Sequence, residues 1–295
     1  MLNRNSIKIS LEENFLNIPS NVIGIDIGQS LSKTAYFDDH GITCSIVDTT
    51  TGIDEIRRLV SSFGKKIKKI NLTGGKAYKL FVDYQKSFET KLINEFKANI
   101  DGLELLHSLK YNKEMPDSII VTIGTGTSIV LKKENFEHIG GSALGGGFLM
   151  GFAKFAYNLT TYQEVIELAN KGNRYNVDLK VGDIYDKQDN RVDLLFREFT
   201  ATTLGKINAN TLLNSVHKED ILSSINAMLA ENIGTIACSF ADFYDVSTIT
   251  FCGGFLIKNK GSKQILSLMS NIKKKKAIFL NYSEFAGALG ALISK

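Results

Sequence analysis

The stretch NVIGIDIGQSLSKTAYFDD (residues 21–39) decides the fold of this chain. Its apolar beginning is typical of a central strand, yet an acid, Asp26, lies inside the run and Gly28 ends it. A second strand-like run, residues 34–37, begins almost at once. A buried acid beside a tight glycine turn is costly unless a cation compensates its charge. A metal-bound phosphate held at the turn would supply that compensation.

The composition is that of an ordinary soluble globular protein. The chain has 295 residues, 43% hydrophobic and 22% charged, which suits one large domain or two modest ones. Cys44, Cys238 and Cys252 show no metal-ligand spacing and indicate buried thiols in a reducing compartment. No apolar run reaches the ~18 residues of a membrane span, and the first residues lack the apolar core of a signal peptide. We therefore expect a cytoplasmic protein without a membrane segment, with residues 1–20 as a loosely attached extension.

The charge pattern gives little indication of a nucleic-acid partner. The net charge is only +4, and the longest run of lysines is Lys273–Lys276. Such a run can form a nucleic-acid or membrane patch. Here no aromatic residues are interleaved for base stacking, and lysines are favoured at the negative end of a helix. The pattern favours a solvated helix end, with neither nucleic acid nor membrane as a partner.

The two halves of the chain carry a similar order of elements. In the first half the predicted elements are strands at 21–28, 32–38, 42–48 and 67–72 and a helix at 52–63. In the second half they are strands within 117–133 and at 136–141, 247–254 and 276–282, and helices at about 145–157, 161–171, 218–243, 262–273 and 284–294. Each half opens with a β-turn-β-β unit and continues as alternating α/β. This weak internal similarity predicts an α/β fold with two related lobes, residues 21–114 and 115–295, and a ligand between them.

Five glycine-rich stretches follow predicted strands, at residues 26–30, 72–79, 122–128, 140–148 and 251–255. Glycine lets a backbone approach a ligand closely and point several N–H groups at an anion. Hydroxyl donors lie in the same stretches, at Ser30, Thr125, Thr127 and Ser128. None of the stretches is a Walker loop or a good dinucleotide GxGxxG motif. A single glycine pair is more often only a tight turn, but five of them favour a phosphate chain held from both lobes.

In combination these segments resemble the type II pantothenate kinases of the actin/sugar-kinase/Hsp70 superfamily. The resemblance runs in order from Val22 to Leu292 through GIDIGQSLSK, LTGGKAYKL, INEF, IGTGTS, HIGGSALGGGFLMG, ELANKGNRYNVDLKVGDIY, ENIGTIA, GGFL and FAGALGALI. It implies two ribonuclease-H-like lobes of the actin/hexokinase type, with ATP in the cleft between them. It also implies an ATP-dependent kinase that uses Mg²⁺ and phosphorylates the primary hydroxyl of pantothenate, the first step of coenzyme A biosynthesis.

The resemblance assigns the charged groups of the expected site to three residues. Asp26 matches the acid near magnesium, Lys33 the lysine that reaches the terminal phosphates, and Glu95 the general base. Without the resemblance, Glu95 and Lys33 would each be read as surface residues. Phosphoryl transfer to an alcohol needs charge neutralisation at the γ-phosphate and a base at the hydroxyl, which these residues would supply.

The remaining assignments concern the nucleotide, the substrate and the assembly. The residues that match nucleotide-binding positions are Gly28, Gln29, Ser30, Gly124, Thr125, Gly126, Thr127, Gly145, Gly146, Gly147, Gly254 and Phe255. The residues expected at pantothenate are Ser128, His138 and Gly141. A homodimer is expected because family members are commonly dimers and the helix at 218–243 is rich in apolar residues, although that helix also suits the core of the second lobe. CoA or acyl-CoA is a candidate feedback ligand.

Three positions depart from the family pattern. Gln29 replaces a glycine of the first turn, so a positive φ at this position would be strained. His138 replaces an arginine at the substrate side and cannot offer a bidentate guanidinium. Lys97 stands where an acid is expected, two residues after Glu95, and would invert a charge near the acceptor.

These departures leave three interpretations of the function. The first is an active pantothenate kinase. The second is a kinase of the same fold for another small alcohol or a pantetheine-like molecule, and the third is a non-catalytic nucleotide- or CoA-binding regulator. The retention of Asp26, Lys33 and Glu95 favours catalysis, because a decayed kinase more often loses one of them.

Overall fold

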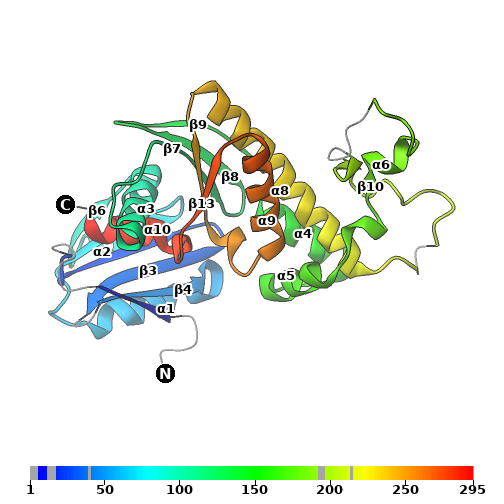
Figure 1. Cartoon of the computed structure of the whole chain (residues 1–295). Coiled ribbons are helices and arrows are strands. Elements are labelled where there is room, and N and C mark those ends of the chain that lie inside the picture. The colour runs from blue at the N-terminus through cyan, green and yellow to red at the C-terminus, as the bar shows by residue number, and fades with distance from the viewer. Residues whose placement is uncertain (1–5, 12–17, 39–40, 192–196, 213–214, 295) are drawn as a thin grey trace.

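Two β-sheets form the frame of the protein, whose computed structural model describes residues 6–11, 18–38, 41–191, 197–212 and 215–294 (Figure 1). The strands of the first sheet are β1 (Ser6–Ser10), β2 (Val22–Ile27), β3 (Leu31–Asp38), β4 (Gly41–Asp48), β5 (Lys69–Thr73) and β6 (Glu89–Leu92). Those of the second sheet are β7 (Ser118–Ile123), β8 (Thr127–Lys132), β9 (Phe136–Ser142), β12 (Thr248–Cys252) and β13 (Lys276–Phe279).

The two sheets repeat one strand order. Apart from β1, the first sheet reads β4-β3-β2-β5-β6 and the second reads β9-β8-β7-β12-β13. In each sheet the first three strands form an antiparallel meander, and the other two join in parallel beside the first strand of that meander. The β2-β3 turn of one sheet therefore corresponds to the β7-β8 turn of the other. This repetition confirms the duplicated α/β pattern that the sequence predicts.

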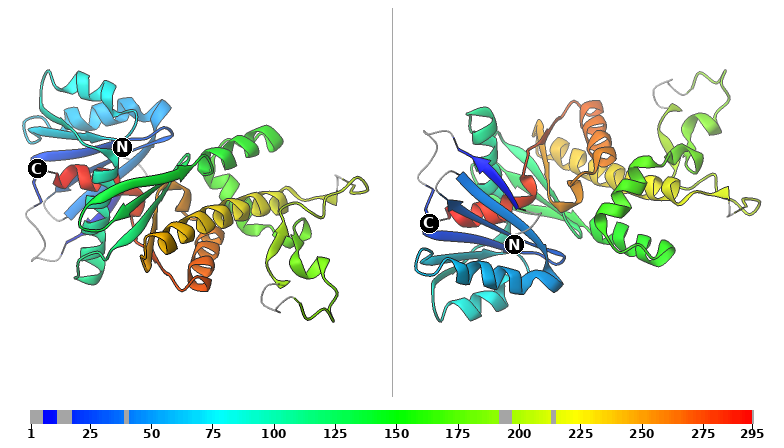
Figure 2. Two further views of the ribbon diagram at one scale, coloured as in Figure 1. Left: turned by 90° about the horizontal axis from the view of Figure 1, so that it is seen from above. Right: turned by 90° about the horizontal axis from the view of Figure 1, so that it is seen from below.

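Helices cover the outer faces of the sheets and fill the space between them (Figures 1 and 2). The outer face of the first sheet packs against α1 (Thr49–Ser62) and α2 (Ala77–Tyr84). The second sheet shares a core with α4 (Gly146–Tyr157), α5 (Tyr162–Lys171), α8 (Lys218–Phe243) and α9 (Lys260–Ile272). Between the sheets lie α3 (Glu95–Tyr111) and α10 (Ala286–Ile293), which bury Leu103 and Leu289 against Ile120 of the second sheet.

Short elements complete the described part of the chain. They are η1 (Arg174–Asn176), β10 (Leu179–Lys180), α6 (Val181–Ile184), β11 (Thr200–Thr202), η3 (Gly254–Leu256) and η4 (Ser283–Phe285). The segment that carries β10 and α6 projects from the second sheet and its helices as an arm (Figure 2). The residues expected to bind the nucleotide lie elsewhere, on the hairpin turns and helix starts of the two sheets.

Two elements lie elsewhere than the sequence predicts. β1, within the segment expected as a loose extension, pairs antiparallel with β4 at the edge of the first sheet. α10, expected in the second lobe, packs against α3 and β2 of the first. Small residues permit this approach, because a Cβ on Gly24 would lie 2.1 Å from the Ala288 carbonyl oxygen. The inner face of β2 is thus covered by the last helix of the described chain.

α8 is a long apolar helix at the centre of the second unit. Among the described residues it alone is long and apolar enough, by length and composition, to cross a membrane. However, 67% of its most apolar window is buried inside the protein. Its buried residues, such as Leu222, Leu229 and Ile233, belong to the core of the second sheet. This burial is the pattern of a core helix.

Candidate active site

Asp26 and Lys33 meet across the first hairpin. They are register partners on β2 and β3, so both side chains lie on one face of the sheet. The Lys33 Nζ atom lies 3.1 Å from Asp26 Oδ2, and the two side chains are only 13% and 12% exposed. α10 can approach this face because a Cβ on Gly287 would already lie 3.0 Å from the Asp26 carboxylate carbon. The buried acid that the sequence indicates is therefore compensated by a lysine of the neighbouring strand.

Glu95 is the first residue of α3. Asn94 caps this helix, and its side-chain oxygen accepts the N–H groups of Phe96 and Lys97 at 2.9 and 3.1 Å. Burial raises the pKa of Glu95, the negative charge of Asp26 raises it further, and the positive charge of Lys33 lowers it. The carboxylate thus lies within electrostatic reach of the ion pair while keeping access to solvent. Such a position suits a base that must meet a substrate.

The first glycine turn is tight and exposed. The Gly28 N–H donates to the Leu31 carbonyl oxygen at 3.1 Å. Gln29 is exposed and is not among the described residues with a positive φ, so its replacement of a glycine causes no backbone strain. The Ser30 hydroxyl oxygen lies 3.0 Å from that of Thr125. The first turn therefore touches the second, as a shared phosphate site requires.

The second turn, residues 124–126, is held by the start of α4. The N–H groups of Gly146 and Gly147 donate to two carbonyl oxygens of the turn, each at 2.8 Å. A Cβ on Gly145 would lie 2.7 Å from the Thr125 carbonyl oxygen. The glycine run therefore packs a helix start closely against the turn. Two of its N–H groups are used within the protein, where they hold the turn in place.

Phe255 anchors a turn from within the core. Phe255 belongs to the segment expected near the adenosine, and its ring, which is 1% exposed, packs in the core of the second sheet and its helices. Its carbonyl oxygen accepts hydrogen bonds from the Asn259 side chain at 3.2 Å and from the Tyr162 hydroxyl. The neighbouring Gly254 faces the first sheet, because a Cβ there would lie 3.2 Å from the Leu31 side chain. In the segment that is expected near the nucleotide, Gly254 thus faces the space between the sheets.

The three residues expected at the substrate share one face of the second sheet. Ser128 directly opposes Gly141 in the β8-β9 register. His138 lies three residues before Gly141, which would place it on the other face, but a bulge in the pairing restores the same face. The His138 ring stacks on Phe96, with centroids 4.5 Å apart. Phe96 follows Glu95 in the first turn of α3, so the stack fixes the start of the helix that carries the candidate base.

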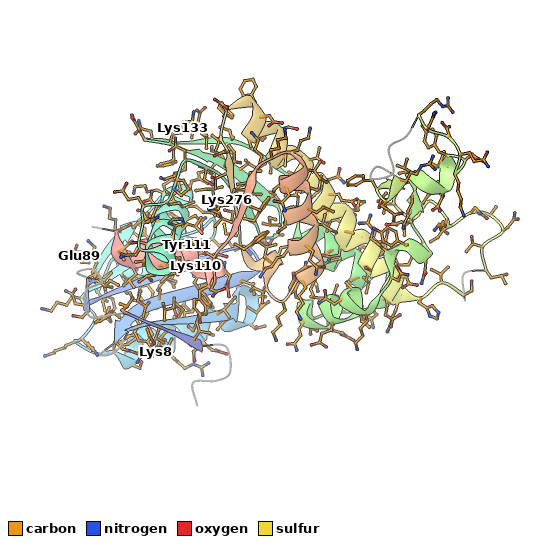
Figure 3. All side chains as sticks on the ribbon, viewed as in Figure 1. Lys8, Glu89, Lys110, Tyr111, Lys133 and Lys276 are labelled. Atoms are coloured by element: carbon orange, nitrogen blue, oxygen red, sulfur yellow. The ribbon has the colours of Figure 1, made fainter. Side chains whose placement is uncertain are left out.

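α3 is fixed to the second sheet at both of its ends. Near its start is the stack of Phe96 on His138. Near its end, Lys110 donates to the Phe279 carbonyl oxygen of β13 at 3.3 Å and lies over the Tyr111 ring (Figure 3). The helix that carries Glu95 is therefore held by the second sheet near both of its ends.

Two residues of the expected site, Lys97 and Thr127, have partners within the protein. Lys97 pairs with Asp101 one turn along α3 and lines a separate cavity of about 600 Å³. Residues two apart on a helix lie on nearly opposite sides, so Lys97 does not share the direction of Glu95. Thr127 is 7% exposed and donates its hydroxyl to the Leu144 carbonyl oxygen at 2.8 Å. Its hydroxyl therefore braces the second turn.

Sequence reasoning missed two residues that the structure brings to this site. Phe96 supplies the ring on which His138 stacks. Lys76 donates from Nζ to the Gln29 carbonyl oxygen at 3.4 Å, at the first turn. The sequence contained two signals for these residues. One was an aromatic residue next to the candidate base, and the other was a lysine inside a glycine-rich stretch.

Relatives of known name match nearly the whole chain. A model of the Fumble family matches residues 40–294. A type II pantothenate kinase of Bacillus cereus is 32% identical over 274 residues, which are 92% of this chain and 96% of that protein. A type II pantothenate kinase of Oceanobacillus iheyensis is 31% identical over 274 residues, 92% of this chain and 98% of that protein.

Solved structures share the two-sheet architecture. The activator of the 2-hydroxyisocaproyl-CoA dehydratase from Clostridium difficile superposes with a TM-score of 0.60 at 19% identity, covering 92% of each chain. A ROK family glucokinase from Streptomyces griseus superposes with a TM-score of 0.57 at 14% identity, covering 92% of this chain and 97% of that one. These likenesses show the two-lobed fold of actin and the sugar kinases, as expected from the duplicated sheets. With the family model and the relatives above, they lead to one conclusion: the chain belongs to the Fumble family, the type II pantothenate kinases.

Proposed function

We propose that the protein transfers the γ-phosphoryl group of ATP to the primary hydroxyl of pantothenate, the first step of coenzyme A biosynthesis. One observation carries the proposal: the buried Asp26–Lys33 pair flanks the first turn, which meets the second turn through Ser30 and Thr125. Membership of the type II pantothenate kinases supports pantothenate as the acceptor and ATP as the donor.

The residues of the cleft divide the reaction between them. The turns at residues 28–30 and 124–126, which touch through Ser30 and Thr125, hold the phosphate chain. Lys33 stabilises the negative charge on the transferred phosphoryl group. Glu95 accepts the proton of the pantothenate hydroxyl as the hydroxyl oxygen bonds to the γ-phosphorus and the bond to ADP breaks.

Asp26 is the residue that would hold Mg²⁺. No group of three or more acids, histidines or cysteines fit for a metal occurs among the residues that the structure describes. A single carboxylate fits magnesium, which usually binds through one or two carboxylates, water and the substrate's phosphates. When bound, the ion neutralises charge on the β- and γ-phosphates. The metal is therefore expected to enter with the nucleotide.

The acceptor lies on the face of β8 and β9. Ser128, Gly141 and His138 share that face, and His138 stacks on Phe96, the residue that follows Glu95 in α3. This arrangement is a suitable wall for a small, flexible alcohol. A CoA or acyl-CoA feedback ligand would compete there, because CoA contains the pantothenate moiety.

The assembly and compartment belong to the same proposal. A homodimer is part of the proposal because family members are commonly dimers, and Phe155 and Phe243, which are 91% and 80% exposed, are apolar rings that a second copy could cover. A cytoplasmic location is supported by three free, buried thiols, and burial raises the pKa of Cys252 to about 11, which suppresses its reactivity.

Coupled-assay measurement of ADP release tests the proposal. The purified protein is incubated with ATP, Mg²⁺ and pantothenate, and with pantetheine and a panel of small alcohols in parallel. Pantothenate-dependent turnover that disappears in Glu95→Ala is the expected result. Turnover only with another alcohol would show that this alcohol, and not pantothenate, is the acceptor. Nucleotide binding without turnover on any alcohol would overturn the proposal in favour of a regulator.

A further inference from the structure

Lys76 places a cation on the first phosphate turn. The segment that carries it folds over the end of β2: Gly74 has φ +93°, and the Lys76 N–H donates to the Ile27 carbonyl oxygen at 3.0 Å. The side chain is exposed, and its Nζ atom lies 3.4 Å from the Gln29 carbonyl oxygen. The neighbouring Ser30 contacts Thr125 of the second turn. Lys76 therefore lies where the two turns meet.

The ammonium group of Lys76 keeps its charge available for a ligand. Its hydrogen-bond acceptor is a neutral carbonyl oxygen. None of the ion pairs within the described ranges includes Lys76. Lys33, the other lysine of the first turn, is already paired with Asp26. Glu95 adds a further negative charge within reach of that pair. A triphosphate that binds here can therefore pair with Lys76 without breaking an existing ion pair.

Lys76 is a poor choice for the stability of α2. It occupies the N-cap position of this helix and makes no side-chain capping hydrogen bond. Serine, threonine, asparagine and aspartate are the residues that stabilise an N-cap, and a cation there opposes the helix dipole. A residue that local stability disfavours, placed on a ligand turn, indicates a role in binding.

We propose that Lys76 is a further substrate-contacting residue of this kinase, which binds the terminal phosphates of ATP from the first turn. The inference rests on the proposed function, because it takes the ligand of the turns to be a nucleoside triphosphate. The Nζ atom moves from the Gln29 carbonyl oxygen to phosphate oxygens by side-chain rotation alone. Binding of the triphosphate then gains a contact that a monophosphate does not make.

Calorimetric titration of Lys76→Ser with the Mg²⁺ complex of a non-hydrolysable ATP analogue (AMPPNP) and with AMP tests this inference. Removal of the cation is expected to weaken AMPPNP binding about five- to twentyfold, as for one charge-assisted hydrogen bond near a surface. AMP binding is expected to change less than about twofold. Lys76→Arg should restore most of the AMPPNP affinity, since it keeps the charge. Lys79→Ser, an exposed lysine of the same helix, is the matched control and should leave AMPPNP affinity unchanged.

Melting temperature separates binding from folding in the same variants. Lys76→Ser should melt at a higher temperature than the parent protein without ligand, because serine caps α2. Unchanged AMPPNP affinity, or equal weakening of AMPPNP and AMP, would overturn the inference. The pantothenate assay tests the proposed function independently of this inference. A parent protein that binds AMPPNP through Lys76 but never phosphorylates pantothenate would refute the proposed acceptor and would still support the phosphate contact of Lys76.

Discussion

The two walls of the cleft share a fold and differ in chemistry. The first wall, the β2-β3 turn with the starts of α2 and α3, carries the charged side chains of Asp26, Lys33, Lys76 and Glu95. The second wall is the β7-β8 turn with the start of α4. Its assigned positions, 124–128 and 145–147, hold only glycine, threonine and serine. One strand order has thus produced a charged wall and a neutral wall.

This difference separates reactivity from positioning. On the first wall, charge sits on side chains that can be replaced without filling space that the backbone occupies. On the second wall, carbonyl and N–H groups are bonded to one another, and a single added carbon atom meets backbone at Gly145. Substitutions on the first wall should therefore change rate and phosphate affinity, and those on the second should change packing.

Glu95→Gln should have the largest effect, because it removes the base and keeps the shape. Turnover is expected to fall about 10²- to 10⁴-fold, the range for a general base, while AMPPNP affinity changes little. Steady-state kinetics and titration calorimetry measure the two quantities. Glu114→Gln, an exposed acid beyond the far end of α3, is the control and should keep full turnover. Full turnover of Glu95→Gln would show that Glu95 is not the general base.

Gly145→Ala should break the neutral wall by packing. Its Cβ would lie 2.7 Å from a backbone oxygen, so the helix start or the turn must shift, at a cost of about 1–3 kcal/mol in the free energy of unfolding. The KM for ATP should rise as well. Gly151→Ala is a matched control in the same helix, where a Cβ meets nothing within 4 Å. It should stabilise the protein by about 0.5–1 kcal/mol. Urea denaturation measures the free energy of unfolding of both variants, and equal changes in the two would contradict the comparison.

Phe96→Leu tests the contact that joins the walls on the acceptor side. Loss of a ring stack worth about 0.5–1.5 kcal/mol should raise the KM for pantothenate about two- to tenfold, with the KM for ATP unchanged. His138→Arg should lower the KM for pantothenate, because a guanidinium keeps the stack and can pair with the carboxylate of the substrate. Phe136→Leu, on the same strand, is the control for a partly exposed ring. Parallel changes in both KM values would place the stack outside the acceptor site.

The smallest expected effect is a dependence of stability on pH. Because burial and Asp26 raise the pKa of Glu95, the folded protein binds its proton more tightly than the unfolded chain does. Ionised Glu95 therefore destabilises the fold above its raised pKa and has no effect below the ordinary value of about 4.3. Glu95→Gln should melt at a higher temperature than the parent at pH 8, and the difference should vanish near pH 3.5. Turnover of the parent should likewise fall as the pH drops through the raised pKa.

The fold could be predicted from local patterns because its decisive units are short. Each meander is a set of adjacent strands with a glycine turn, so apolar runs and glycines suffice to recognise both. The place of α10 could not be predicted in this way. Its packing against β2 depends on the close approach of Gly24 and Gly287 to distant partners, and nothing within the helix indicates that partner.

The site shows the same boundary between local and distant information. Asp26 and Lys33 could be predicted because a hairpin brings them together. The bulge that returns His138 to the face of Gly141, and the burial of the Phe255 ring, depend on pairings and packing that no motif encodes. Lys97 was misplaced because a count along the sequence ignores the turn of the helix, which directs it to Asp101.

The position of α10 also constrains how the protein is made. A ribosome makes β2 before the second sheet and makes α10, the helix that covers the inner face of β2, only after that sheet, so the emerging first sheet keeps apolar surface exposed in between. The second sheet closes its own core with α8 and α9, which lie nearer to it in the chain. We expect the nascent first sheet to depend on chaperones until α10 has been made, and catalytic competence to appear only after that helix has packed against β2.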